Sequence, residues 1–336
     1  MAAPDMTRVA CLGFVFDPVA QEIVRQAAPA GFVLSFAERA DQVTDAMLAE
    51  SDIVMGVAAV TGDMMDRAPR LRMIQKWGAG YDQIDVKAAR QRGITVAITA
   101  GVNANTIGEH AILLMLAVLR RLVLADRAFR EGRWITGELR PQSRKLFGKT
   151  VGIVGFGNIG RAAARYLRGF QTRTLCCSRT KPADAALREL GVTYVPFEQL
   201  LAESDVVTLH CPGGAANRHM IDASAIGRMK RGAVLINTAR GELVAEEDLV
   251  DALLSGQLSG AGLDVFAQEP LRPSSRLRAL PNVVLTPHSA GSVIDDVGLM
   301  AGHAFANIQC FLRGDAIRPA DLIVDPEAPR PAAQRS

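Results

Sequence analysis

A glycine-rich run near the middle of the chain constrains its fold more than any other feature. The pattern GxGxxG follows the β-branched apolar stretch 151–154 directly and stands at the opening of a helical stretch. In this setting it predicts a tight strand-to-helix turn whose backbone approaches a pyrophosphate at the positive end of the helix. We therefore expect a dinucleotide-binding unit in which the cofactor meets Gly155, Gly157, Asn158, Ile159 and Gly160.

Short strand-like and helix-like segments alternate along most of the 336 residues. Before the glycine run they cover 9–16, 21–28, 53–57, 72–77, 86–92 and 94–98. From the run onward we expect strands at 150–154, 173–177, 192–195, 205–209, 233–236, 260–265 and 283–286, with helices at 158–168, 183–190 and 246–255. Such alternation is typical of parallel sheets with crossover helices, so we predict an α/β fold with doubly wound, Rossmann-like parallel sheets.

A single long helix is expected from Ile107 to about Arg130. Thr106 and Glu109 have the spacing of a capping box before an apolar run. The apolar part, 111–119, is much shorter than a bilayer span, which predicts a buried helix and no membrane partner.

Charge and cysteine content exclude several classes of function. Lys and Arg total 38 against 35 Asp and Glu, without a basic block, so we expect no nucleic-acid partner. The five cysteines lack zinc-like spacing, which predicts reduced thiols and no metal; adjacent Cys176 and Cys177 should face opposite sides of a strand. Residues 1–16 lack the pattern of a secretory signal, which predicts a cytoplasmic protein.

The residues after the strand 173–177 bear on the choice of nicotinamide cofactor. Dinucleotide folds commonly place an acid here to hold the adenosine ribose hydroxyls, but this chain has Ser178, Arg179 and Thr180. Serine removes the repulsion of a 2′-phosphate, and the guanidinium of Arg179 can pair with one. We therefore favour NADP(H) and keep NAD(H) as the open alternative.

Three ordered motifs, at 229–244, 262–270 and 280–291, make the chain resemble the D-isomer-specific 2-hydroxyacid dehydrogenases. Segments 77–85 and 101–110 resemble the substrate-domain loops of that family, so the resemblance extends over nearly the whole chain. It implies a catalytic set of Arg240, Glu269 and His288. Reduction of a 2-oxo acid develops negative charge on the carbonyl oxygen, which requires a proton donor and a cation beside it.

The resemblance assigns further residues to ligands. The substrate would meet Ala79, Gly80, Asn103 and Arg240. The cofactor would also meet Thr106, His210, Cys211, Pro212, Thr238, Ala239, Asp264 and His288. Asp82 either belongs to the substrate site or only caps a turn, and both interpretations stay open.

The resemblance also implies a layout. We expect a flavodoxin-like substrate domain from 1–106 and 291–325, a dinucleotide-binding domain from 107–290 and a loose tail from 326–336. The active site would lie in the cleft, and hinge closure would exclude water. An apolar helix at 107–124 and an arm around Trp134 predict a homodimer.

The expected substrate is a small 2-oxo acid. Phosphoglycerate dehydrogenases of the family usually carry an Arg-Ser pair where this chain has Met55 and Gly56, which disfavours a phosphorylated substrate. With Ser178 and Arg179, the chain more closely resembles NADPH-dependent glyoxylate and hydroxypyruvate reductases. A phosphoglycerate dehydrogenase-like enzyme, a nicotinamide-sensing corepressor and a formate or phosphite enzyme remain alternatives. The loop at Gly213 and Gly214 departs from the family pattern.

Overall fold

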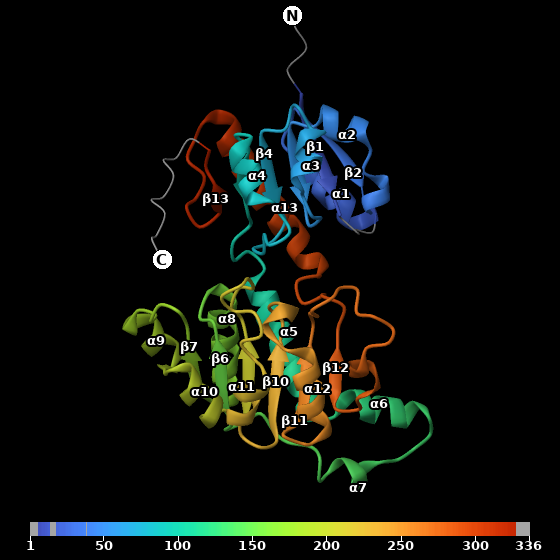
Figure 1. Ribbon diagram of the computed structural model, residues 1–336, viewed down its shortest axis with the longest axis vertical. Helices are drawn as coiled ribbons and strands as arrows, with labels where there is room; N and C mark the ends of the chain where they lie inside the picture. Colours follow the sequence, from blue (N-terminus) through green and yellow to red (C-terminus); the bar gives the residue numbers. More distant parts are fainter. Residues whose placement is uncertain (1–5, 14–17, 38, 327–336) are drawn as a thin grey trace, which may run out of the picture. The chain divides into compact units, whose positions relative to one another are not determined.

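The chain forms two compact units, one interrupted in sequence and one continuous (Figure 1). The computed structural model describes residues 6–13, 18–37 and 39–326. Unit 1 contains the chain up to Asn103 and from Val293 onward, and unit 2 contains Ala104–Ser292. Of the expected tail, only Pro326 is among the described residues.

Unit 1 is built on a six-stranded sheet with the order β13-β5-β4-β3-β1-β2. All neighbouring strands are parallel except β13, which pairs antiparallel with β5. Without β13 the order is 2-1-3-4-5, which is the flavodoxin-like order. The elements are β1 (Thr7–Leu12), α1 (Pro18–Ala27), β2 (Phe32–Ala37), α2 (Asp45–Glu50), β3 (Ile53–Gly56), α3 (Gly62–Asp66), β4 (Met73–Lys76), α4 (Val86–Gln91), β5 (Thr95–Ala97), α13 (Ile294–Arg313) and β13 (Leu322–Val324).

Both faces of this sheet are buried, because successive side chains of a strand point to opposite sides. Val9 and Cys11 of β1 pack in one cluster with residues of α1 and α13, including Phe305. Ala10 and Leu12 pack in the other cluster with residues of α2, α3 and α4. Helices on both faces explain why the strands are apolar throughout instead of alternating with polar residues.

Unit 2 contains a seven-stranded, fully parallel sheet with the order β12-β11-β10-β9-β6-β7-β8. Counted from β6, this is the Rossmann order 3-2-1-4-5-6 with one further strand. The strands are β6 (Thr150–Val154), β7 (Arg173–Cys177), β8 (Val192–Tyr194), β9 (Val206–Leu209), β10 (Ala233–Asn237), β11 (Leu258–Leu263) and β12 (Val283–Leu285). The helices are α5 (Ala104–Leu119), α6 (Leu122–Arg130), α7 (Thr136–Leu139), α8 (Asn158–Leu167), α9 (Asp184–Leu190), α10 (Phe197–Glu203), α11 (Ala223–Arg228) and α12 (Glu246–Leu254).

The predicted alternation of the two adjacent cysteines is confirmed. Cys176 belongs to the apolar cluster that includes α5 and α8, whereas Cys177 belongs to the cluster that includes α10, α11 and α12. All five cysteines are free thiols. Burial raises the pKa of Cys177 to about 12, so this thiol stays protonated and unreactive at neutral pH.

The prediction of one long helix from Ile107 to Arg130 is wrong in two respects. The helix α5 begins at Ala104, so Thr106 lies inside its first turn and cannot be its N-cap. The helical run also stops before Arg121, whose φ of 54° is left-handed, and α6 begins after it. The guanidinium of Arg121 donates to the carbonyl of Ser259 at 2.9 Å, which anchors the break beside β11. Within the described part of the chain, no helix is long and apolar enough to cross a membrane.

Candidate active site

An imidazole–carboxylate pair forms the centre of the site in unit 2. Nδ1 of His288 lies 2.7 Å from Oε2 of Glu269, and the other carboxylate oxygen accepts from the backbone N–H of Phe266 at 3.0 Å. The hydrogen bond that His288 makes to Glu269 raises the pKa of His288 above its ordinary value, although burial alone would lower it. The negative charge of Glu269 adds to the rise. About half of the His288 side chain is exposed, and its Nε2 makes no hydrogen bond to any described residue. This nitrogen can therefore present a proton to a ligand.

The turn after β10 brings a cation close to this pair. The side chain of Asn237 accepts from the N–H of Ala239 at 3.0 Å and donates to the carbonyl of Arg240 at 2.8 Å, which shapes the turn. A Cβ on Gly241 would lie 1.8 Å from the carbonyl carbon of Phe266, so only glycine allows this approach. Burial raises the pKa of Glu269, but its hydrogen bonds to His288 and Phe266, together with the charges of His288 and Arg240, lower it overall. The charge of Arg240 also offsets part of the rise in the pKa of His288.

Asp264 holds the loop that carries His288. Its carboxylate is inaccessible and accepts from the hydroxyl of Thr286 at 2.6 Å and from the N–H groups of Ser289 at 2.8 Å and Ala290 at 2.9 Å. The N–H of His288 donates to the carbonyl of Asp264 at 2.7 Å. His288 adopts a left-handed φ of 52°, a backbone conformation that is unfavourable for residues other than glycine. The hydrogen bonds to Asp264 maintain this conformation. The resemblance assigned Asp264 to the cofactor, and that role stays a prediction beside the bonds to the loop.

The glycine-rich turn after β6 has the form that a pyrophosphate requires. Gly155 has a φ of 95°, and a Cβ there would lie 2.6 Å from the carbonyl oxygen of His210. A Cβ on Gly160 would lie 2.2 Å from the carbonyl oxygen of Gly155, so the helix α8 packs closely on the turn. Gly157 has open space beside it and caps α8 without a side-chain hydrogen bond, which leaves backbone N–H groups at Asn158 and Ile159 for a ligand.

Two buried polar atoms lie without protein partners at the carboxyl ends of β9 and β10. They are Nδ1 of His210 and Oγ1 of Thr238. Nε2 of His210 lies 3.0 Å from the hydroxyl of Thr208, and burial lowers the pKa of His210 to about 4. This imidazole is therefore neutral at pH 7 and does not compete with His288 as a proton donor. Unpaired buried polar groups are costly, so both atoms fit a site that a bound cofactor completes.

The segment after β7 is exposed and carries an available cation. The hydroxyl of Ser178 donates to the carbonyl of Thr180 at 2.8 Å, and that of Tyr194 donates to the carbonyl of Ser178 at 3.2 Å. Arg179 is exposed and forms no ion pair with any residue of the described part of the chain. Cys211, Pro212 and Ala239 lie in the turns after β9 and β10, and Thr106 is partly exposed on α5.

The expected substrate residues Ala79, Gly80 and Asn103 belong to unit 1. Ala79 is exposed, and the loop that carries it begins at Gly78, whose N–H donates to the hydroxyl of Thr99 at 2.7 Å. The three catalytic candidates belong to unit 2. Asp82 is exposed in the same loop as Gly80.

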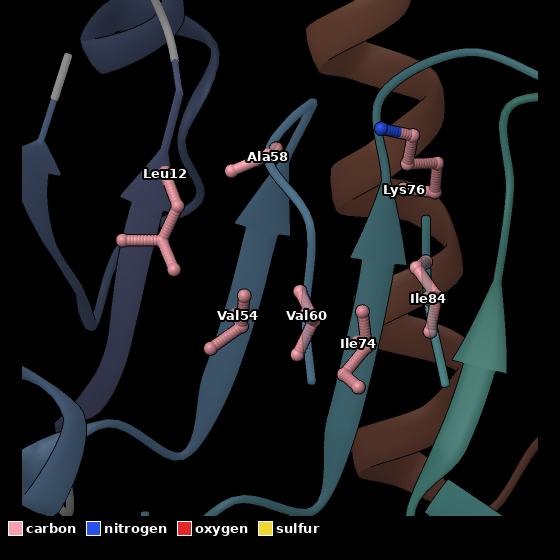
Figure 2. A pocket seen from close by; sticks show the side chains of 8 residues that line it. Leu12, Val54, Ala58, Val60, Ile74, Lys76 and Ile84 are labelled. Carbon is pink, nitrogen blue, oxygen red and sulfur yellow. The ribbon is translucent and has the colours of Figure 1, made fainter. Parts of the chain in front are cut away.

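The positions that match the phosphate-binding pair of phosphoglycerate dehydrogenases cannot present a cation here. Met55 is fully buried, and a Cβ on Gly56 would lie 2.0 Å from the carbonyl oxygen of Leu12. Figure 2 shows the adjoining pocket of unit 1, whose lining is apolar except for Lys76. The ammonium of Lys76 donates to the carbonyl of Val57 in the loop after β3.

Comparisons with known proteins identify the family. Residues 112–290 match the model of the D-isomer specific 2-hydroxyacid dehydrogenase NAD-binding domain, more than half of the chain. The chain belongs to this family. A glyoxylate reductase of Korarchaeum cryptofilum is 43% identical over 79% of this chain and 79% of its own. A hydroxypyruvate reductase of Thermotoga maritima is 37% identical over 72% of this chain and 78% of its own.

Solved structures agree with the family assignment. A formate dehydrogenase of Granulicella m. superposes with a TM-score of 0.84 at 27% identity, covering 96% of this chain and 99% of that one. A D-lactate dehydrogenase of Aquifex aeolicus, solved with NAD and lactic acid, has a TM-score of 0.78 at 28% identity and covers 91% of this chain and 96% of that one. As a family member, the chain uses a nicotinamide cofactor and acts on a small 2-oxo or 2-hydroxy acid.

Sequence reasoning missed the contacts that His110 makes with the residues holding the His288 loop. Nε2 of His110, on α5, lies 3.1 Å from the hydroxyl of Thr286 and 3.6 Å from the carboxylate of Asp264. No spacing rule joins residues 110 and 286, which are distant in sequence. Thr286, two residues before His288, was the available signal, because a hydroxyl there can reach the carboxylate of Asp264, which follows β11.

Proposed function

We propose that this family member reduces glyoxylate, hydroxypyruvate or a similar 2-oxo acid to the D-2-hydroxy acid. The observation that carries the proposal is the 2.7 Å contact between His288 and Glu269 beside Arg240. When bound, the nicotinamide supplies the hydride. His288 donates the proton from Nε2 to the carbonyl oxygen, Glu269 keeps the imidazolium charged and oriented, and Arg240 neutralises the charge that develops on that oxygen.

Proton balance favours this reaction over formate oxidation. Reduction of a 2-oxo acid consumes one hydride and one proton, whereas oxidation of formate to carbon dioxide releases a hydride and no proton. A histidine whose pKa is raised by a carboxylate partner serves the first reaction and has no proton to transfer in the second.

An unphosphorylated substrate is part of the proposal. The buried side chain of Met55 and the crowded backbone at Gly56 leave no guanidinium where the phosphoglycerate enzymes have one. A phosphate group would therefore lose a charge-assisted contact that strongly favours its binding.

NADP(H) is the proposed cofactor of choice. The exposed guanidinium of Arg179 has no acidic partner in the described part of the chain, and Ser178 stands where an aspartate would repel a 2′-phosphate. A solvent-exposed charge pair gives on the order of 1 kcal/mol, and the absence of a repelling aspartate adds a similar amount, so we expect a preference on the order of tens-fold for NADPH over NADH.

Turnover tests the proposal directly. Purified protein is mixed with NADPH or NADH and with glyoxylate, hydroxypyruvate, pyruvate or 3-phosphohydroxypyruvate while absorbance at 340 nm is followed. We expect oxidation of NADPH with the unphosphorylated acids. Preference for 3-phosphohydroxypyruvate would instead establish the phosphoglycerate alternative, and no turnover with any acid would favour the corepressor.

The cofactor preference is tested by Arg179→Gln. We expect kcat/KM with respect to NADPH to fall roughly fivefold while the value for NADH stays within about twofold. Arg188→Gln is the matched control, since Arg188 is also an exposed arginine but lies on α9. An equal loss for both cofactors in Arg179→Gln would remove the selector role.

A further inference from the structure

We infer that Thr99 and Asp321 are positioning residues for the substrate loop, because they hold the backbone from which that loop starts. Neither residue is among the expected ligand contacts, and both lie in unit 1 with the loop itself. The inference rests on the proposed function in one respect, which is that Ala79 and Gly80 receive the substrate carboxylate.

Thr99 is bonded to the start of the loop through both its side chain and its backbone. The N–H of Gly78 donates to Oγ1 of Thr99 at 2.7 Å, and the N–H of Thr99 donates to the carbonyl of Gly78 at 3.1 Å. Thr99 has no exposed surface, so water does not compete for these bonds. Gly78 has a left-handed φ of 108°, and the chain turns there immediately before Ala79. The pair therefore sets the direction in which the N–H groups of the loop leave β4.

Asp321 holds the residues on both sides of Thr99. The N–H of Ala100 donates to Oδ1 of Asp321 at 2.8 Å, and the N–H of Ile98 donates to the backbone carbonyl of Asp321, also at 2.8 Å. The carboxylate is inaccessible and also accepts from His303 at 2.9 Å and from Arg318 at 2.8 and 2.9 Å. Burial raises the pKa of Asp321, but the bonds from Arg318, Ala100 and His303 outweigh it and lower the pKa overall.

The carbonyl groups of the same segment are also bonded. Arg318 donates to the carbonyl of Ala100 at 2.9 Å, and the buried amide of Asn307 donates to the carbonyl of Ile98 at 3.0 Å. Ile98 and Ala100 therefore have both backbone polar groups bonded to residues near the C-terminal end of the described chain. Asp321 is thus hydrogen-bonded to Ala100, the chain neighbour of Thr99, and Thr99 is hydrogen-bonded to Gly78.

Such support matters because a carboxylate is bound by directed N–H groups, and their orientation determines how well it is held. The substrate carboxylate does not change charge in the reaction, so its contacts are the same in the ground state and the transition state. A displaced loop should therefore raise KM and leave kcat nearly constant.

Thr99→Val tests this role, since valine keeps the shape of threonine and removes the oxygen that accepts from Gly78. We expect KM for glyoxylate to rise roughly tenfold, with kcat and the Kd for NADPH within about twofold of the wild type. Thr99→Ser retains the hydroxyl and should restore KM. An equal rise of KM in the serine variant would assign the effect to packing and overturn the role of the hydrogen bond.

Hydrogen exchange provides a readout that does not depend on turnover. We expect amide exchange in a peptide covering residues 77–85 to be faster in Thr99→Val than in the wild type and to be restored in Thr99→Ser. Unchanged exchange in the valine variant would overturn the inference even where activity is lost. If the wild type reduces no 2-oxo acid, the proposed function fails, and the exchange data alone decide whether Thr99 holds the loop.

Asp321→Asn extends the test to the start of the series, with Asp315→Asn as the matched control. Asp315 pairs with Arg313 at 2.6 Å on the surface, whereas Asp321 is inaccessible. We expect the folded protein of Asp321→Asn to exchange its amides at residues 77–85 faster than the wild type, and Asp315→Asn to exchange them at the wild-type rate. Equal exchange in the two variants would limit the positioning role to Thr99 and overturn that of Asp321.

Discussion

His288 carries the proton in the proposed reaction, and Glu269 determines the pH range in which it can do so. Because the folded pKa of His288 is raised, the imidazolium persists to a higher pH than that of a free histidine. The pair also stabilises the fold below the unfolded pKa of about 6.5, and this contribution is lost as the pH rises through the folded value. Reduction should therefore be fastest on the acidic side of that folded pKa.

Replacing Glu269 should move this limit. In Glu269→Gln we expect kcat/KM for glyoxylate at pH 7 to fall roughly 10 to 100-fold, with the decline beginning at a lower pH than in the wild type. Glu247→Gln is the control, because Glu247 forms only a surface pair with Arg276. A pH profile of kcat/KM measures the shift, and an unshifted profile would contradict the pairing as the cause.

At the scale of elements, the site depends on close approach between the turns that follow β10 and β11. Gly241→Ala should force these turns apart, because the added Cβ would fall on the backbone of Phe266. We expect a loss of stability of about 2 kcal/mol and a lower kcat/KM, since Arg240 and Glu269 flank this contact. Gly227→Ala is the control, because its helical site on α11 has open space. Thermal unfolding of both variants measures the difference, and equal melting temperatures would contradict the contact.

The elements that sequence reasoning could predict are those with strong local patterns. The strands β6, β7, β9 and β10 lie within one residue of their predicted bounds because each is a short apolar run beside a turn signal. The short helices α10 and α11 were missed, since seven and six residues are too few to show a helical period. The break at Arg121 was missed because a tertiary bond to Ser259 supports it, and β13 because two short apolar segments pair across distant parts of the chain.

The residues of the site divide in the same way. Arg240, Glu269 and His288 could be named in advance because each lies in a motif with a chemical rationale. The supporting residues His110 and Thr99 could not, because they act through contacts whose partners are set only by the tertiary fold. Hydrogen-bond partners distant in sequence leave no local pattern to read.

At the scale of the whole molecule, the exposed apolar residues of α6 and the following arm support the homodimer that the sequence predicts. Phe129 and Trp134 are 66% and 80% exposed, and their ring centroids lie 6.0 Å apart. Leu122 and Val123 add further exposed apolar surface on α6. These apolar residues are exposed in the single chain, and a second copy packed against them would bury them.

Trp134→Glu tests the dimer. A buried charge opposes association, so we expect the sedimentation coefficient at micromolar concentration to fall from that of a dimer to that of a monomer. Val19→Glu is the control, because Val19 is also exposed but lies on α1 in unit 1. A wild type that sediments only as a monomer would remove the proposal.

The interruption of unit 1 has a consequence for synthesis on the ribosome. All residues of unit 2 leave the ribosome before Val293, so this unit has its complete sequence while unit 1 still lacks α13 and β13. Until Phe305 and its neighbours arrive, part of the apolar cluster around Val9 and Met73 stays uncovered. Unit 1 is thus the first unit to be started and the last to be completed. A chaperone that shields nascent chains would find exposed apolar surface on its incomplete sheet.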